Sequence, residues 1–241
     1  AYDPRSLYHI RNNSYPIEDD LLREVDSFYD KLIKHNVEVI RPNNINNCNQ
    51  IFARDLGFVI SNLFFLSNIV PNRHDELKGI EDTLKNLDVG VIKLPEFMHI
   101  EGGDVIVHND KVFIGTYSDE DYPKLITART NNSSIDYLKK MITSKEIIPL
   151  DLKKSNTDIY KNTLHLDCCF QTLANDKAII CPDGFKNKKD VLKFIRKQDF
   201  AYEIVDFDVG DLNGDGKNEL VLIDRNRVMV FKNKKGYLSK I

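Results

Sequence analysis

Residues 104–117, DVIVHNDKVFIGTY, decide the fold class, because two short apolar runs flank Asn109-Asp110, a residue pair typical of hairpin turns. The next segment, SSIDYLKKMI (133–142), predicts a helix, and KEIIPL (145–150) predicts another strand. The stretch therefore predicts one ββαβ unit, in which a hairpin is followed by a helix and a closing strand.

The same order of elements occurs upstream of this stretch. GFVISNLFFLSN (57–68) predicts a hairpin that turns at Ser61-Asn62, and VGVIKL (89–94) predicts the closing strand. Between them, the leucine and isoleucine residues of DELKGIEDTLKNL (75–87) recur at helical spacing. We therefore expect one helix over residues 75–87 and a second ββαβ unit.

A third unit is predicted downstream. LHLDCCFQTLANDKAIICP (164–182) predicts a hairpin that turns at Asn175-Asp176. KDVLKFIRK (189–197) predicts its helix, and YEIVDF (202–207) predicts its closing strand.

The segment before these three units predicts only half a unit. LLREVDSFYDKLIKHN (21–36) has the pattern of a helix, and VEVIR (37–41) that of a strand, but no hairpin precedes them. The three predicted units start at residues 57, 104 and 164. A supersecondary unit that recurs at such a spacing favours a radial or stacked array over one continuous sheet.

Composition excludes several classes of protein. The chain has 241 residues, of which 41% are hydrophobic, enough for a sizeable core. Its 34 basic and 37 acidic side chains leave a net charge of −3, which argues against a nucleic-acid partner. The chain has no apolar run of the roughly 20 residues that cross a membrane, and its first residues do not resemble a signal peptide. Four cysteines without a CxxC pair favour a reduced, cytoplasmic location.

Polar residues gather at the start of each predicted hairpin. Asp55 precedes the first hairpin, and Glu101 and Asp104 flank a glycine pair before the second, where we expect a β-bulge. His165 and Asp167 are two residues apart, which would place both side chains on one face of a strand. Each residue alone has a structural explanation, as a turn residue or a strand cap. Their recurrence at equivalent positions instead favours a common site.

A cluster of carboxylates requires a compensating cation. Guanidinium fits better than a metal ion, because its planar fork of N–H donors matches carboxylate oxygens, whereas the spacing shows no carbonyl or water ligands of the kind that a hard metal also needs. The residues therefore predict a guanidinium pocket with a histidine beside it.

Three motifs in this order resemble the superfamily of arginine deiminases, dimethylarginine hydrolases and amidinotransferases. They are FARD (52–55), IEGGD (100–104) and LHLDCCF (164–170). The longer stretches NQIFARDLGFVI and TYSDEDYPKLITART are most similar to the bacterial amidinotransferase-like branch. The resemblance extends from residue 1 to about residue 200.

The resemblance implies a fold, an α/β five-bladed pseudo-symmetric propeller of ββαβ units, which would be incomplete in this chain. It would form a first domain, residues 1–200, and residues 201–241 would form a β-hairpin tail. Because an incomplete propeller exposes sheet edges and apolar surface, we expect self-association.

The resemblance also implies roles for the site residues. Asp55 and Asp167 would hold the guanidinium group of a small-molecule substrate, and Asp104 would support the same pocket. Glu101 and His165 would be the acid–base pair, and Arg129 is a candidate for binding a substrate carboxylate. No cofactor is implied for this domain.

The nucleophile of the superfamily is a cysteine near the C-terminus, attacking the guanidinium carbon. The chain has no cysteine after Cys181. Cys169 is a weak substitute, because four residues along a strand would place it roughly 13 Å from His165. The identity of the nucleophile stays open, as does the choice between a hydrolase and a transferase.

The tail carries a different motif. Oxygen donors alternate through a short loop that is similar to the calcium loops of FG-GAP-type repeats, and the donor residues are Asp211, Asn213, Asp215 and Glu219. The segments ELVLID and RVMVFK predict a hairpin after this loop. Calcium is thus a candidate cofactor of the tail.

Two other functions remain open. One is a catalytically silent protein that binds guanidinium compounds without turnover. The other is a calcium-dependent interaction module, although the chain has only one such loop.

Overall fold

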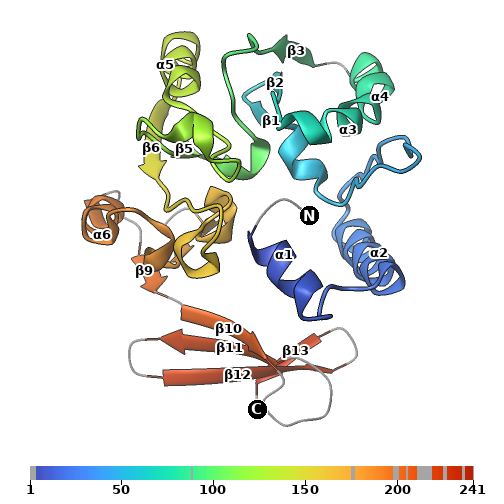
Figure 1. Cartoon of the computed structure of the whole chain (residues 1–241), viewed down its shortest axis with the longest axis vertical. Coiled ribbons are helices and arrows are strands. Elements are labelled where there is room, and N and C mark those ends of the chain that lie inside the picture. The colour runs from blue at the N-terminus through green and yellow to red at the C-terminus, as the bar shows by residue number, and fades with distance from the viewer. Residues whose placement is uncertain are drawn as a thin grey trace. The chain divides into compact units, whose positions relative to one another are not determined.

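The structure of the chain is a computed structural model (Figure 1). It describes residues 4–87, 89–174, 177–197, 201–204, 206–210, 219–224, 227–234 and 237–240, with side chains up to Ile195 except at residue 174. The chain divides into two compact parts, an N-terminal part (Ala1–Asp167) and a C-terminal part (Cys168–Ile241), and each is described by itself.

The N-terminal part begins with two helices, α1 (Pro4–Arg11) and α2 (Glu18–Lys34). Helix α2 confirms the helix predicted over residues 21–36. The expected strand over residues 37–41 is wrong, because these residues form no ladder. A strand is stable only when its backbone groups pair with a neighbour. The first described hairpin, β1–β2, pairs with β3 instead.

The first sheet contains the predicted hairpin, β1 (Gly57–Ile60) and β2 (Leu63–Leu66). Strand β3 (Gly90–Lys93) closes the unit by pairing in parallel with β2. This agrees with the predicted ββαβ order.

The expected single helix over residues 75–87 is wrong, since the segment forms α3 (Asp75–Lys78) and α4 (Glu81–Asn86). The break lies at Gly79, whose carbonyl accepts a hydrogen bond from the backbone N–H of Asn43 at 2.7 Å. A carbonyl turned toward another segment cannot continue the i to i+4 pattern of the helix.

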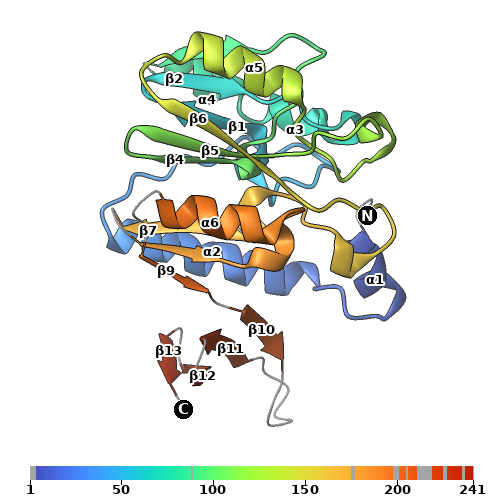
Figure 2. The same ribbon diagram turned by 90° about the vertical axis from the view of Figure 1, so that its left-hand side faces the viewer.

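The second sheet confirms the central unit, with β4 (Val105–His108) antiparallel to β5 (Lys111–Thr116) and β6 (Glu146–Asp151) parallel to β5. Helix α5 (Asn132–Met141) lies beside this sheet (Figures 1 and 2). One hydrophobic core joins both sheets and α5. Its members are Phe58, Ile60, Phe65, Leu94, Met98, Ile100, Val105, Val112, Ile114, Ile135, Leu138, Ile142 and Ile147.

Short 3-10 turns precede the strands at the places where the polar motifs lie. Turn η1 (Ala53–Leu56) leads into β1, and η3 (Gly102–Asp104) leads into β4. The expected β-bulge at the glycine pair is therefore wrong. The expected strand through His165 is wrong as well, because η6 (Leu166–Cys168) follows it.

Four further 3-10 turns lie in connecting segments. They are η2 (Pro71–Arg73), η4 (Tyr122–Lys124), η5 (Ile159–Lys161) and η7 (Pro182–Gly184).

The C-terminal part contains the third ββαβ unit. Strand β7 (Phe170–Ala174) is antiparallel to β8 (Lys177–Ile180), and β9 (Ala201–Ile204) runs parallel to β8. Helix α6 (Lys188–Lys197) lies between them in the sequence. The predicted order is confirmed, although the closing strand is shorter than expected.

The tail forms a four-stranded antiparallel sheet in the order β10-β11-β12-β13. Its strands are β10 (Asp206–Gly210), β11 (Glu219–Asp224), β12 (Arg227–Lys234) and β13 (Tyr237–Lys240). The predicted hairpin is therefore confirmed as β11–β12. The calcium-loop residues Asp211, Asn213 and Asp215 lie outside the described residues, as does the side chain of Glu219.

The chain is thus an α/β protein whose described strands form four separate small sheets. Within the described part of the chain, no helix has the length and apolar character needed to cross a bilayer. The proposed domain boundary at residue 200 stays a prediction.

Candidate active site

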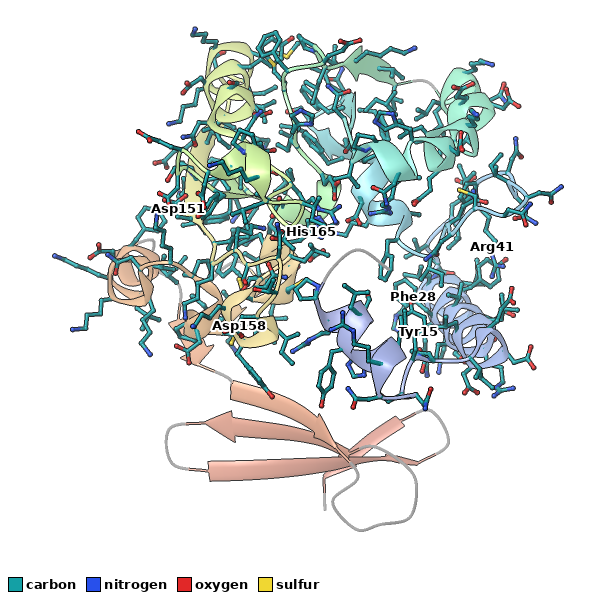
Figure 3. The ribbon with its side chains drawn as sticks, viewed as in Figure 1. Tyr15, Phe28, Arg41, Asp151, Asp158 and His165 are labelled. Atoms are coloured by element: carbon teal, nitrogen blue, oxygen red, sulfur yellow. The ribbon has the colours of Figure 1, made fainter. Side chains whose placement is uncertain are left out.

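The candidate site lies within the N-terminal part of the chain. There η1 and η3 pack against each other, and His165 comes close to both (Figure 3). Each turn is the entry to a strand that is anchored in the core, so the polar residues are held by buried backbone. Turns η1 and η3 thus occupy equivalent positions at the entries to β1 and β4, and both lie close to His165.

The glycine pair permits this convergence by leaving space. A Cβ atom on Gly102 would collide with the carbonyl oxygen of Arg54. A Cβ atom on Gly103 would lie 2.8 Å from Cγ of His165 and 2.9 Å from Oδ1 of Asp55. Close approach of backbone and side chains therefore requires glycine at both positions.

Glu101 and His165 form the centre of the site, and both are almost completely buried. Nε2 of His165 donates a hydrogen bond of 2.8 Å to Oε2 of Glu101, since an ionised carboxylate can only accept. Nδ1 of His165 lies 3.7 Å from Oδ1 of Asp55. The imidazole is thus flanked by a carboxylate on each side.

Arg129 supplies the positive charge that Glu101 needs inside the protein. Its Nη1 donates to both carboxylate oxygens of Glu101, at 3.0 and 3.1 Å, and its Nε donates to the carbonyl of Ile126 at 2.7 Å. The side chain is only 7% exposed, so Arg129 is a buried arginine. In this structure Arg129 bonds to Glu101.

The electrostatics of the pair favour the charged forms. Burial alone would raise the pKa of Glu101, but the hydrogen bond from His165 and the charge of Arg129 lower it to about 2. Burial alone would lower the pKa of His165, but the hydrogen bond to Glu101 and the charges of Asp104 and Asp55 raise it above its usual value. The histidine can therefore carry a proton near neutral pH.

Asp55 is held by an arginine that the sequence reasoning missed. Nη1 of Arg73 donates to Oδ2 of Asp55 at 2.7 Å, while Nε and Nη2 of Arg73 bind both oxygens of Glu76, also at 2.7 Å. The spacing of Arg73 and Glu76, three residues apart, was the available signal. The link to Asp55 could not be read from the sequence.

Asp104 is fully buried and supports the loop that carries His165. Its Oδ1 accepts from the backbone N–H of Leu166 at 2.9 Å, and its Oδ2 accepts from the hydroxyl of Thr130 at 2.7 Å. Complete burial raises the pKa of Asp104. Asp104 thus connects the segment of Thr130 to the segment of Leu166.

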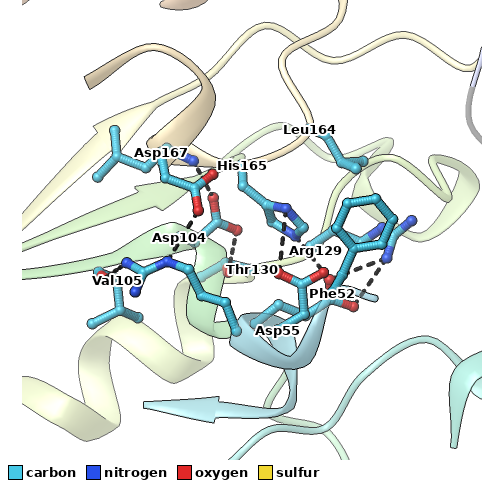
Figure 4. Close-up of polar contacts among 12 residues, drawn as sticks. Phe52, Asp55, Asp104, Val105, Arg129, Thr130, Leu164, His165 and Asp167 are labelled. Carbon is cyan, nitrogen blue, oxygen red and sulfur yellow. Dashed lines mark hydrogen bonds and ion pairs between the residues drawn. The ribbon is translucent and has the colours of Figure 1, made fainter. Parts of the chain in front are cut away.

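Asp167 lies at the edge of the site, with its side chain 29% exposed. Its Oδ2 accepts a hydrogen bond of 3.0 Å from Nε of Arg54, whose Nη2 also donates to the carbonyl of Val105 at 2.8 Å (Figure 4). Because η6 is a 3-10 turn, Asp167 and the buried His165 differ strongly in exposure. The expectation of one shared strand face is therefore wrong.

Asp55, Glu101 and His165 also present ligand-type atoms within 4.8 Å of one another. Both carboxylates bond to arginine in this arrangement, and a metal ion would have to compete with these cations. These arginine contacts therefore oppose a metal ion at this donor set.

Four cysteines have different environments. Cys48 is partly exposed, and burial together with the charges of Glu76 and Asp75 raises the pKa of its thiol. The other three cysteines lie in the C-terminal part of the chain, where Cys168 is exposed, Cys169 is buried and Cys181 is partly exposed. The raised pKa disfavours the thiolate form of Cys48, which is the reactive form.

Known proteins resemble this chain over most of its length. Residues 7–238 match the family described as N,N dimethylarginine dimethylhydrolase, eukaryotic. The uncharacterized protein YkgA of Bacillus subtilis (strain 168) is 33% identical over 151 residues, which cover 62% of this chain. The chain spans about half, 46%, of the length of that relative.

Solved structures share the fold. The N-terminal domain of ArgZ, a cyanobacterial arginine dihydrolase determined with its product, has a TM-score of 0.59 at 20% identity, covering 75% of this chain and 63% of that domain. SxtG, an amidinotransferase from Microseira wollei in the saxitoxin biosynthetic pathway, has a TM-score of 0.60 at 18% identity, covering 78% and 64%. Since the family match spans nearly the whole sequence, this chain belongs to the N,N-dimethylarginine dimethylhydrolase family, within the superfamily of guanidino-modifying enzymes.

Proposed function

We propose that the chain carries the guanidinium-binding and acid–base residues of an enzyme that cleaves a C–N bond of arginine or a related guanidino compound. The observation that carries this proposal is the buried Glu101–His165 pair, flanked by Asp55 and Arg129. Membership of the family supports the class of substrate.

Asp55 and Asp167 hold the substrate guanidinium in this proposal. Each of them bonds to a guanidinium group of the chain in this structure, Asp55 to Arg73 and Asp167 to Arg54. Carboxylates that already bond to planar N–H donors have the orientation that such a ligand needs. Arg129 remains the candidate for a substrate carboxylate, and Asp104 supports the loop of His165.

Catalysis proceeds through a covalent amidino-cysteine. A thiolate attacks the guanidinium carbon, the new C–S bond forms, and the C–N bond breaks while protonated His165 gives its proton to the departing amine. Water or an acceptor amine then attacks the same carbon, neutral His165 takes its proton, and the thiolate leaves. The choice of water or amine distinguishes a hydrolase from a transferase.

The nucleophile is the incomplete part of the proposal. Cys48 has a raised pKa, and Cys169 is buried. The alternative is a protein that binds guanidinium compounds without turnover. The solved structure of an ArgZ variant covalently bound to a reaction intermediate supports covalent chemistry in that protein.

The finer architecture is also a proposal. The three ββαβ arrangements support the blades of a five-bladed α/β propeller, with residues 1–200 as its domain. Calcium binding by Asp211, Asn213, Asp215 and Glu219, a cytoplasmic location, and the absence of nucleic-acid and membrane partners stay predictions. A calcium-dependent rise in melting temperature that disappears in Asp215→Asn would support the loop.

Calorimetric titration of the full chain with L-arginine and with N,N-dimethylarginine tests the binding site. We expect saturable binding that Asp167→Asn weakens, because one of the two carboxylates is lost. Asp110→Asn, at an exposed aspartate on the β4–β5 turn, is the control and should bind like the parent. An undiminished affinity in Asp167→Asn, or no binding by the parent chain, would contradict the proposed site.

Mass spectrometry after treatment with 2-chloroacetamidine separates the enzyme from the silent binding protein. This amidine alkylates a thiol that is placed to attack a guanidinium carbon. Labelling of one cysteine that L-arginine prevents would identify the nucleophile. Binding without selective labelling would favour the silent protein.

A further inference from the structure

The dipeptide Arg54-Asp55 contacts two other parts of the candidate site, His165 and Asp167. Asp55 lies next to His165 and bonds to Arg73, whereas the neighbouring side chain, Arg54, bonds to Asp167. One short turn thereby connects to both carboxylates that hold the guanidinium in the proposed function. The connection to Asp167 joins residues 113 positions apart in the sequence.

The backbone of Arg54 is fixed by its surroundings. Its carbonyl oxygen packs so closely against Gly102 that a Cβ atom there would collide with it. Turn η1 continues directly into β1, which is anchored in the core. The backbone of Arg54 is therefore closely packed, although 53% of its side chain is exposed.

The guanidinium of Arg54 is held at two atoms. Nε bonds to Asp167, and Nη2 bonds to the carbonyl of Val105 at the start of β4. The planar fork is thus fixed against a strand, and this geometry also fixes the direction from which it meets the carboxylate. An ammonium group has no such fork and cannot hold the same two directions.

Asp167 needs this support more than the other site residues do. Its turn is held at the backbone N–H of Leu166 by Asp104, but its side chain is 29% exposed, against 9% for Asp55 and 1% for Glu101. For a partly exposed carboxylate, each contact that fixes its rotamer before a ligand binds lowers the entropy cost of binding.

We propose that Arg54 is a positioning residue, which presets the carboxylate of Asp167 for the guanidinium of the ligand. The inference rests on the proposed function, because it assigns Asp167 to the guanidinium group. It predicts that Arg54 acts on affinity and contributes little to stability, since partly exposed ion pairs contribute about 0–1 kcal/mol to folding.

Calorimetric titration with L-arginine of Arg54→Gln, Arg54→Lys and the parent chain tests this role. We expect roughly tenfold weaker binding in Arg54→Gln, with partial recovery in Arg54→Lys, because lysine keeps the charge and loses the fork. In an Asp167→Asn background the same substitution should have little further effect, since its target is already changed.

Arg41→Gln is the matched control. Arg41 is also 53% exposed and also forms an ion pair with an aspartate, Asp26, at 2.8 Å. We expect it to bind L-arginine like the parent and to melt at a similar temperature to Arg54→Gln.

A second measurement observes the pair without ligand. Nitrogen-edited NMR of the arginine side chains should show the Nε–H of Arg54 protected from exchange with water in the parent chain and exposed in Asp167→Asn. No difference between the two would overturn the pair itself.

The outcomes separate this inference from the proposed function. Tighter binding by Arg54→Gln would mean that Arg54 competes with the ligand, and unchanged binding would mean that it has no role; either overturns the inference and leaves the proposed function intact. Absence of guanidino-ligand binding by the parent chain overturns the proposed function, and the positioning role falls with it.

Discussion

At the residue scale, the chain buries opposite charges together. Glu101 is 1% exposed, yet it accepts hydrogen bonds from His165, from Arg129 and, at 3.3 Å, from the backbone N–H of Val70. A buried carboxylate is tolerated only when such donors replace its water shell. Removing one donor should therefore affect the others.

The raised pKa of His165 predicts how stability depends on pH. A histidine whose folded pKa exceeds its unfolded value of about 6.5 stabilises the fold fully below that value and progressively less as the pH rises through the folded pKa. We therefore expect the free energy of unfolding to fall above pH 6.5 in the parent chain. His165→Gln should be less stable and should lose this part of the dependence.

Urea denaturation between pH 5.5 and 9 measures the effect. The difference between the parent and His165→Gln should shrink as the pH rises, because the parent then loses the part of its stability that the proton on His165 provides. A difference that stays constant over this range would contradict the raised pKa.

The glycine pair predicts a second effect at this scale. Gly103→Ala would place a methyl group against the ring of His165 and the carboxylate of Asp55, both buried, so overpacking should cost about 1–3 kcal/mol. Gly90→Ala is the control, because its Cβ would meet only the end of the flexible Leu63 side chain. Equal losses of unfolding free energy in the two variants would argue against the close packing.

At the element scale, the three-stranded ββαβ arrangement explains which segments fold. Every described sheet of this type pairs its third strand in parallel with the second strand of its hairpin. Residues 37–41 lack such a hairpin partner and form no strand. Strand formation thus depended on a neighbour, whereas α2 formed from its own local hydrogen bonds.

Helix α5 provides the prediction at this scale. Its N-cap, Asn131, accepts from the backbone N–H of Ser134 at 3.1 Å, and its side-chain amide donates to the carbonyl of Phe97 at 2.8 Å. We expect Asn131→Ala to destabilise the protein by about 1–2 kcal/mol. Asn131→Asp keeps the cap acceptor and should lose less, as thermal unfolding would measure; a larger loss in the aspartate variant would contradict the capping role.

At the scale of the whole molecule, exposed apolar side chains concentrate near the N-terminus. More than half of the described large apolar residues that are exposed lie within residues 8–52. Helix α2, all of whose residues are described, has none that is buried, and Phe28 projects from it with 65% of its surface exposed (Figure 3). Exposed apolar side chains in such numbers favour association.

We therefore expect the chain to self-associate as its concentration rises. Phe28→Lys should shift the sedimentation velocity profile toward the monomer. Phe97→Lys is the matched control, because Phe97 is 63% exposed but lies outside this segment. A parent chain that sediments as a monomer at every concentration would refute the expectation.

The sequence by itself determined the repeated units and the residue types of the site. Hairpin turns and helical spacing act over a few residues, so their patterns identified the sheets of all three units and α2, α5 and α6. The local signal failed where a distant contact intervened, as at Gly79, whose carbonyl bonds to Asn43. The motifs also predict that Asp55, Glu101 and His165 are neighbours, and their ligand-type atoms lie within 4.8 Å of one another.

Only the tertiary structure decided which carboxylate bonds to which cation. Arg73 reaches Asp55 across 18 residues, Arg129 reaches Glu101 across 28, and Arg54 reaches Asp167 across 113. Those pairings depend on 3-10 turns whose backbones approach at the glycine pair, and such packing leaves no periodic pattern in the sequence. Electrostatic partners are chosen by distance in space, which the order of residues along a chain does not encode locally.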